Sequence, residues 1–193
     1  IKNVECIKDF NEAINLSPNY SNSYYMRAVS SLTLINDWES SLSDIKKFLT
    51  LEPSDEAGNN LSNALNLVKD KSVAINKQIS EGNENFEKGE ELLEASKDKE
   101  ASEFLNKAVL KYEKAILSWD KNHPYLYEKS HSTSLPQIMF KKIQCRLHLK
   151  DEMDIILKEC LEIYKTSAGR FNPKEGVLGA KIYSMAKVLN DNA

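Results

Sequence analysis

The sequence contains few of the residues that break regular structure. Its 193 residues include only six glycines and five prolines. A β-sandwich or β-barrel needs a turn about every 8–12 residues, so this scarcity argues against such folds and favours long helices. Hydrophobic residues make up 41% of the chain and charged residues 28%. This composition is typical of a folded globular protein and not of a disordered chain.

An excess of charge of one sign is also missing. Lysine and arginine number 26 against 29 aspartates and glutamates, which gives a formal net charge of −3. This balance argues against a dedicated nucleic-acid binder. No apolar run approaches the roughly 18 residues that a membrane span needs. We therefore expect a cytoplasmic, or alternatively nuclear, protein that binds no nucleic acid and does not insert into a membrane.

Cysteine and histidine are scarce as well. Cys6, Cys145 and Cys160 are odd in number and far apart, which favours thiols in a reducing compartment. A disulfide between Cys145 and Cys160 across two packed helices is the less favoured alternative. His148 stands alone beside Cys145, without the ligand spacing of a zinc site. Motifs typical of nucleotide binding or hydrolysis are absent from the sequence. We expect no cofactor, no metal and no enzymatic activity.

One spacing of residues occurs twice in the first quarter of the chain. Small, aromatic or branched apolar residues recur at the same offsets from Cys6 to Pro18 and from Ser41 to Pro53, so the two prolines lie 35 residues apart. Proline cannot continue a helix, so each segment is predicted to be a helix ending at Leu-x-Pro. Tyr24 to Leu34 forms a further amphipathic pattern between them, and Asn36-Asp37 is predicted to be a turn.

These offsets resemble the tetratricopeptide repeat of about 34 residues. Ser21 to Pro53 resembles one complete repeat, and residues 1–18 resemble the second helix of a repeat whose first helix is missing, so we expect an upstream part to precede Ile1. The resemblance implies an all-α fold, a right-handed superhelical array of antiparallel helix pairs. We expect one block over residues 1–75 and a divergent block with extended helices over residues 76–193.

A second match begins downstream. Glu81 to Gly89 resembles the first helix of the repeat as it occurs in chaperone-binding members of the family. The pattern of the second helix, Ala108 to Ile116, follows only after an added segment from Glu90 to Asn106. This segment has no proline and is rich in Glu, Lys, Ala and Leu, so it is predicted to lengthen both helices.

Further helices are expected on either side of this match. A helix pair is predicted from Ser134 to Lys150 and from Glu152 to Lys165, and a final helix from Lys174 to Leu189. Residues 121–136 are predicted to be a polar loop. Apolar spacing from Glu56 to Asn76 is compatible with one long helix, or with a break near residues 70–72.

The resemblance implies a non-catalytic scaffold that binds a peptide or helix of a partner protein in a concave groove. By the family's pattern, nine residues face this groove or its edge. They are Asn22, Tyr25, Met26, Val29, Asn76, Ile79, Asn83, Phe86 and Lys141. Tyr25, Met26 and Phe86 would be apolar anchors, while Asn22 and Asn83 would bind the partner's backbone. Core packing or indifferent surface is the alternative at each position.

Some members of the family hold a chaperone's C-terminal carboxylate with a clamp of Lys, Asn and Arg. Asn83 matches one clamp position, but Ile79 occupies a lysine position and Lys141 lies near where a second Asn is expected. Asn22 and Met26 replace the Lys and Arg of the first block, with Arg27 displaced onto a neighbouring face. Each lost charge-assisted hydrogen bond costs about 1.5–3 kcal/mol. We expect a co-chaperone-like scaffold without a complete clamp.

Two other classes of function remain compatible with the sequence. The chain could be an architectural subunit of a large assembly that packs through the segment from Glu90 to Asn106. It could also be an appendage of a catalytic domain that lies outside this sequence. The partner's identity and the oligomeric state stay open, because the fold alone does not specify them.

Overall fold

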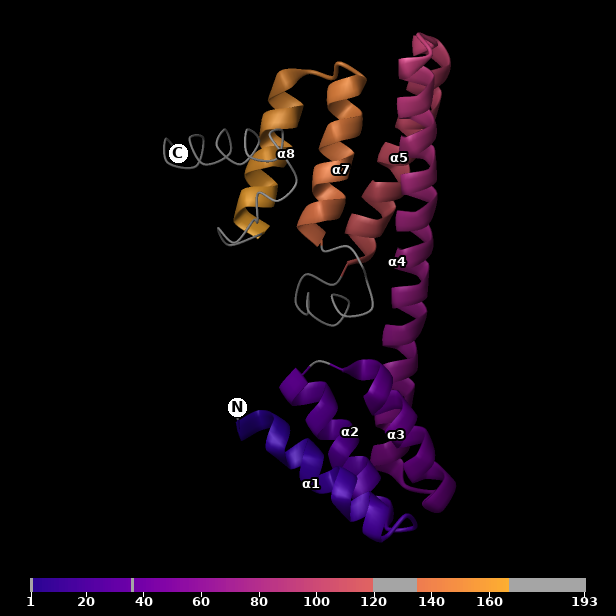
Figure 1. Ribbon diagram of the computed structural model, residues 1–193, viewed down its shortest axis with the longest axis vertical. Helices are drawn as coiled ribbons and strands as arrows, with labels where there is room; N and C mark the ends of the chain where they lie inside the picture. The colour runs from indigo at the N-terminus through magenta and orange to yellow at the C-terminus, as the bar shows by residue number, and fades with distance from the viewer. Residues whose placement is uncertain (1, 36, 120–134, 167–193) are drawn as a thin grey trace. The chain divides into compact units, whose positions relative to one another are not determined.

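Helices dominate the chain. The computed structural model describes residues 2–35, 37–119 and 135–166 (Figure 1). The helices are α1 (Lys2–Leu16), α2 (Ser21–Ile35), α3 (Trp38–Leu51), α4 (Glu56–Glu94), α5 (Asp98–Ser118), α7 (Leu135–His148) and α8 (Met153–Thr166). No strand occurs within these ranges, which confirms the all-α class. The expected final helix from Lys174 to Leu189 and most of the expected loop lie outside the described residues.

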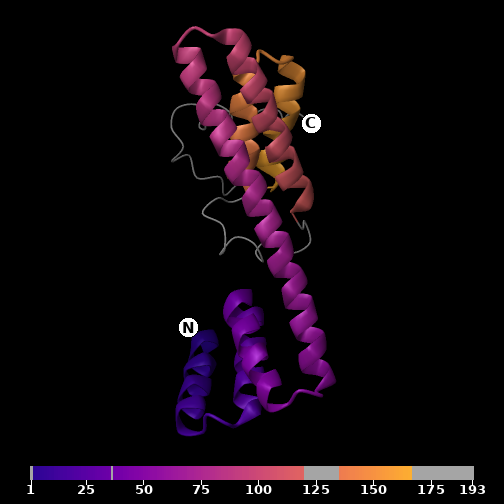
Figure 2. The same ribbon diagram turned by 90° about the vertical axis from the view of Figure 1, so that its right-hand side faces the viewer.

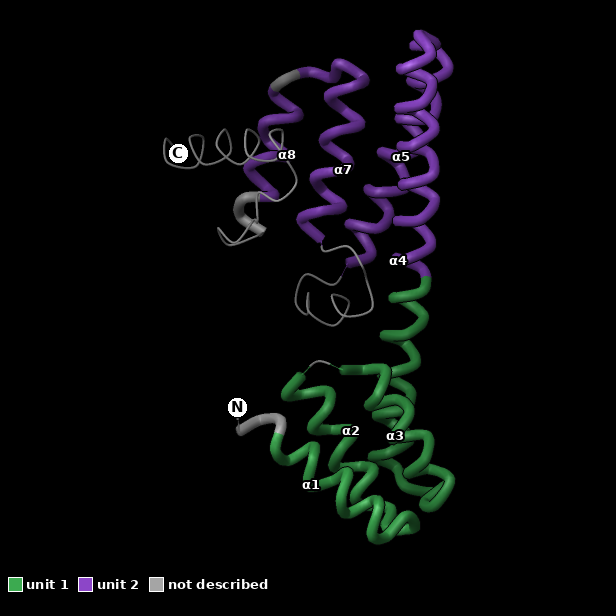
Figure 3. The backbone as a smooth tube through the Cα atoms, viewed as in Figure 1, with its two compact units in different colours: residues 1–73, 122–130 green, residues 74–121, 131–193 purple. Residues whose placement is uncertain are grey.

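The chain divides into two compact units, and the division falls inside α4 between Val73 and Ala74 (Figure 3). Unit 1 contains α1, α2, α3 and the first part of α4. Unit 2 contains the rest of α4 together with α5, α7 and α8. The described chain therefore has two hydrophobic cores, and α4 contributes to both.

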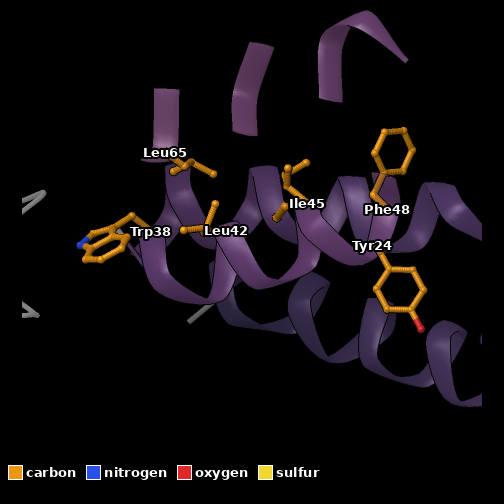
Figure 4. Packing of buried hydrophobic residues seen from close by; sticks show 7 residues of the cluster. Tyr24, Trp38, Leu42, Ile45, Phe48 and Leu65 are labelled. Atoms are coloured by element: carbon orange, nitrogen blue, oxygen red, sulfur yellow. The ribbon is translucent and has the colours of Figure 1, made fainter. Parts of the chain in front are cut away.

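The core of unit 1 comes from residues at helical spacing on three helices. Leu65 of α4 lies beside Leu42 of α3 in this cluster (Figure 4). The cluster consists of Tyr24, Ala28, Trp38, Leu42, Ile45, Phe48 and Leu65. Because the apolar residues of α3 recur every three or four positions, they share one face that α2 and α4 cover.

The ends of the helices in unit 1 follow the sequence signals. α1 ends at Leu16 and α3 ends at Leu51, in each case two residues before a proline, as predicted. Asp37 caps α3, since its carboxylate accepts a hydrogen bond from the backbone N–H of Ser40 at 3.2 Å. Asp37 of the predicted turn is thus the cap that begins the next helix, while Asn36 lies outside the described residues.

α4 is one unbroken helix of 39 residues. The alternative with a break near residues 70–72 is therefore wrong. α4 ends at Glu94 and α5 begins at Asp98, so the segment from Glu90 to Asn106 lengthens both helices, as predicted. Its only interruption is a short turn.

In unit 2, glycines allow α4 and α5 to approach closely, and the two helices run side by side in both views (Figures 1 and 2). A Cβ atom at Gly82 would lie 2.7 Å from the ring of Tyr112, and one at Gly89 would lie 2.7 Å from Leu105. Tyr112 and Leu105 are both buried. A larger residue at Gly82 or Gly89 would have to displace the neighbouring side chain, Tyr112 or Leu105 respectively, and so push α5 away from α4.

The turns after α4 and α7 have the same geometry. Ser96 and Lys150 both have φ of 58°, in the left-handed region. The N–H of the next residue, Lys97 or Asp151, bonds back to Leu92 or Arg146, which ends the helix in a Schellman motif. The predicted helix pair from Ser134 to Lys165 is present as α7 and α8, joined by the second of these turns.

All three cysteines are thiols in the structure. Cys145 of α7 and Cys160 of α8 are buried in unit 2. Burial raises the pKa of the Cys145 thiol to about 12 and that of Cys160 to about 11. The two thiols therefore stay protonated at neutral pH, and the disulfide between them is not formed.

Among the described residues, no helix combines the length and the apolar character required to cross a membrane.

Candidate functional site

Two of the predicted partner-binding residues meet in unit 2. The side-chain oxygen of Asn83 on α4 accepts a hydrogen bond from Nζ of Lys141 on α7 at 2.8 Å. The same oxygen accepts a second hydrogen bond from the hydroxyl of Tyr112 on α5 at 2.9 Å. Since Tyr112 is fully buried against Gly82, the Asn83 amide is held in one orientation by three helices.

This polar cluster has an uneven distribution of charge. Lys141 donates to a neutral amide, so this bond does not neutralise the ammonium charge. Burial first, and then electrostatic repulsion from Cys145, Glu87 and Glu90, raise the pKa of the Tyr112 hydroxyl far above its ordinary value. Tyr112 is therefore a neutral donor at neutral pH. Lys141 is half-buried and lies beside two neutral groups.

The other predicted residues of this block divide into core and surface. Ile79 and Phe86 are 6% and 8% exposed, and the Phe86 ring lies 6.3 Å from the ring of His148 on α7. Both side chains are thus core residues that hold α4 in place. Asn76 is exposed. The structure therefore brings Asn83 and Lys141 together and leaves Asn76 on the surface.

In unit 1, three of the four predicted residues lie on the side of α2 that faces away from the core. Asn22 is exposed, Met26 is 45% exposed and Val29 is half-buried. Spacings of three and four residues place these three side chains on one stripe along the helix, which we name the α2 stripe. Tyr25 lies at its edge, half-buried, with its ring 5.2 Å from the ring of Phe48.

Arg27 lies on another side of α2. Its guanidinium donates two hydrogen bonds to the Asp44 carboxylate, at 2.8 and 2.6 Å, and a third to the side-chain oxygen of Asn11 at 2.7 Å. The hydrogen bonds to Asp44 are the main cause that raises the pKa of Arg27. Arg27 is thus bound to α1 and α3 and does not belong to the α2 stripe.

Beside Arg27 lies a polar cavity of about 320 Å³ that the sequence did not predict. Its lining comes from α1, α2, α3 and the residue before α3. The lining residues are Ile7, Asn11, Arg27, Ser31, Ile35, Asp37, Ser40, Ser43 and Asp44. Arg27 and Asp44 are the charged pair of this lining, but they are 17 residues apart, which is not a helical spacing. The sequence therefore gave no sign that they would meet.

A network of ion pairs in unit 2 was also missed by sequence reasoning. Arg146 of α7 contacts Glu113 of α5 at 2.9 Å, Asp151 at 2.8 Å and Glu159 of α8 at 3.1 Å, and Lys142 contacts the same Glu159 at 2.9 Å. Burial lowers the pKa of Arg146, but the acidic partners, Asp151 first, outweigh it and raise the pKa overall. These contacts fasten α7 to both of its neighbours.

The described residues hold no group of three metal-ligating side chains. The sequence matches no protein-family model and no curated protein, and no solved structure matches the chain. The side chains described above are therefore the basis for a functional proposal.

Proposed function

We propose that the chain is a non-catalytic scaffold of helix pairs, similar to a tetratricopeptide array, that binds a peptide segment or a helix of a partner protein. The observation that carries this proposal is the hydrogen bond between Asn83 and Lys141. Two residues that the repeat pattern assigns to partner binding, far apart along the chain, form one polar cluster.

The chemistry of this cluster suits an acceptor on the partner. Lys141 and Tyr112 both donate to the oxygen of the Asn83 amide. The NH₂ group of the same amide and the other hydrogens of the Lys141 ammonium are further hydrogen-bond donors in this cluster. A backbone carbonyl or a carboxylate of a partner is the group that such a pair of donors would bind.

The α2 stripe supplies a second kind of contact. Met26 is a large, flexible apolar side chain that stays 45% exposed while Tyr24 and Ala28 of the same helix are buried. Methionine adapts its shape to a partner's apolar groups, and Asn22, one turn away, can bind the partner's backbone. We assign to this stripe the apolar part of partner recognition in unit 1.

Peptide selection followed by calorimetry tests the proposal. A random peptide library is displayed against the full chain, and selected peptides are titrated into the original chain and into Lys141→Met and Met26→Ser variants. Lys141→Met keeps the length of the buried stem but removes the charge. Losing a charge-assisted hydrogen bond costs about 1.5–3 kcal/mol, so we expect affinity for carboxylate-bearing peptides to fall at least about tenfold.

A matched control is Lys158→Met, which removes an exposed lysine from α8. Circular dichroism verifies that each variant stays folded. Unchanged affinity in both Lys141→Met and Met26→Ser, or an equal loss in Lys158→Met, would contradict the assignment of these residues to partner binding.

A second candidate function is that of an architectural subunit. The observation that favours it is the elongated end of unit 2, where the segment from Glu90 to Asn106 lengthens α4 to 39 residues and α5 to 21. Residues 94–100 at this end are all exposed. The double variant Glu94→Lys/Lys99→Glu reverses two exposed charges there. It should spare peptide binding by the scaffold, but it should disrupt assembly if this end packs against other subunits.

A further inference from the structure

The outer face of α5 has two exposed leucines. Leu110 is 57% exposed and Leu117 is 83% exposed. They are seven residues apart, which is two helical turns, so they lie on one face. Lys107 and Lys114 each lie three residues before one of these leucines, and Glu103 lies seven residues before Leu110, so all three share this face and all three are exposed. We name these five residues the α5 outer stripe.

The core contacts of α5 fix which way this stripe points. The helix buries Ala101, Leu105, Ala108, Tyr112 and Ala115 on its opposite side. The helix therefore cannot turn its leucines inward without exposing these residues. Single exposed leucines are common on protein surfaces. Two in heptad register along one helix have the spacing with which a second helix packs.

The exposed charges beside these two leucines belong to lysines, whereas Glu113, which also borders them, is half-buried and forms an ion pair with Arg146. Lys107 and Lys114 alternate with the leucines, and Nζ of Lys107 lies 4.7 Å from the centre of the Phe104 ring. Lys111 borders the stripe and forms an ion pair with Glu81 of α4. The pKa of Glu81 is lowered, chiefly by its hydrogen bond with Lys111 and further by the charges of Lys77 and Lys114.

We propose that the α5 outer stripe docks an acidic amphipathic helix of a partner protein, one with apolar residues seven positions apart and Asp or Glu beside them. The leucines provide the apolar seam. Lys107 and Lys114 provide the flanking charges that such a helix complements. None of these five residues belongs to the cluster of Asn83 and Lys141 or to the α2 stripe.

The same charges argue against a parallel pairing with a second copy of this chain. A parallel pairing of two α5 helices through their leucines places each lysine next to its own counterpart. Like charges in such positions repel.

The test uses a synthetic helical peptide with Leu every seven residues and Glu at the flanking positions. Its binding to the full chain is measured by fluorescence anisotropy at low and high salt. We expect saturable binding that weakens with salt. The variant L110S/L117S should weaken binding at least about tenfold, while the control L67S, which changes a leucine of α4 that is 64% exposed, should not.

Charge reversal gives a second readout that loss of folding cannot imitate. The variant K107E/K114E should lose the Glu peptide and gain binding to a matched peptide with Lys in place of Glu. The proposal is overturned if the original chain binds the Lys peptide as well as the Glu peptide, or if L110S/L117S binds like the original chain.

Two other occupants give distinct results, and either would overturn the proposal. If the stripe binds a membrane surface, the chain will sediment with vesicles of phosphatidylserine and phosphatidylcholine, and L110S/L117S will abolish this. If it binds a second copy, light scattering will show a dimer that L110S/L117S dissociates. Failure of the α5 proposal leaves the effects of Lys141→Met and Met26→Ser unchanged.

Discussion

Asn83 and Lys141 are 58 residues apart along the chain, yet the amide oxygen of Asn83 lies 2.8 Å from the Nζ atom of Lys141. Tyr112 donates to the same oxygen from a third helix. Because Tyr112 is fully buried, its hydroxyl depends on this acceptor for a hydrogen bond. The amide of Asn83 therefore supports the packing of unit 2 and also positions a cation at its surface.

Replacing Asn83 by Ala should destabilise the chain by about 1–3 kcal/mol, since it leaves the buried Tyr112 hydroxyl without its acceptor. Tyr112→Phe removes the donor. The free energy of unfolding of the double variant should therefore fall by less than the sum of the decreases in the two single variants. Urea unfolding of the four chains gives this coupling energy. Additive effects would show that Asn83 and Tyr112 do not interact energetically.

Replacing Gly82 by Ala should also destabilise the chain, although Ala is the better residue in a helix by about 1 kcal/mol. The new methyl group would lie 2.7 Å from the buried Tyr112 ring, and such overpacking costs about 1–3 kcal/mol. Thermal unfolding measures the net effect. In a Tyr112→Leu background the penalty should shrink, and a penalty of the same size there would refute the steric explanation.

The turns after α4 and α7 offer stabilising substitutions. Ser96 and Lys150 are exposed and hold left-handed backbone with φ of 58°, a conformation that glycine adopts with less strain. Ser96→Gly and Lys150→Gly should each raise the free energy of unfolding by about 0.5–1 kcal/mol. The control Lys158→Gly, inside α8, should lower it by about 1 kcal/mol. A loss of stability in both turn variants would contradict the assigned backbone conformation.

The chain should lose stability in alkaline solution. Burial raises the pKa of Cys145 to about 12 and of Cys160 to about 11, from an ordinary value of 9.0. Between pH 9 and 11 the unfolded chain releases these two protons and the folded chain keeps them. The free energy of unfolding should therefore fall as pH rises, by about 1.4 kcal/mol per pH unit for each thiol.

The raised pKa of Tyr112 adds to this slope above about pH 10. Urea unfolding at a series of pH values measures the effect. The double variant Cys145→Ala/Cys160→Ala is less stable at every pH because it opens small cavities. Its free energy of unfolding should fall less steeply above pH 9, by the slope that corresponds to two released protons. An equal slope in the two chains would mean that the thiols titrate normally when folded.

Local signals predicted the helices, and tertiary packing decided what they could not. The prolines after Leu16 and Leu51 and the cap at Asp37 act within a few residues, so the ends of α1 and α3 could be predicted from the sequence. The spacing of apolar residues around residues 70–72 was compatible with one helix or two. Only the structure distinguishes them, because no glycine or proline occurs there to decide.

The candidate site shows the same limit. The repeat pattern selected Asn83 and Lys141, but it could not reveal that Tyr112 would share their hydrogen bond. It also could not separate Phe86, which packs beside His148, from Met26, which stays exposed, since both are large apolar residues at similar helical positions. The burial of Phe86 depends on where α7 packs, and the position of α7 is determined by many weak contacts that no short motif encodes.

The continuity of α4 has a consequence for how the chain folds. Starting a helix is costly, whereas extending one by a residue is nearly neutral or favourable. Since the helix passes without interruption from unit 2 into unit 1, the first turns formed in either core serve as the nucleus for the other half. The core that forms second then begins with one helix already initiated, so we expect the continuous backbone of α4 to couple the folding of the two units.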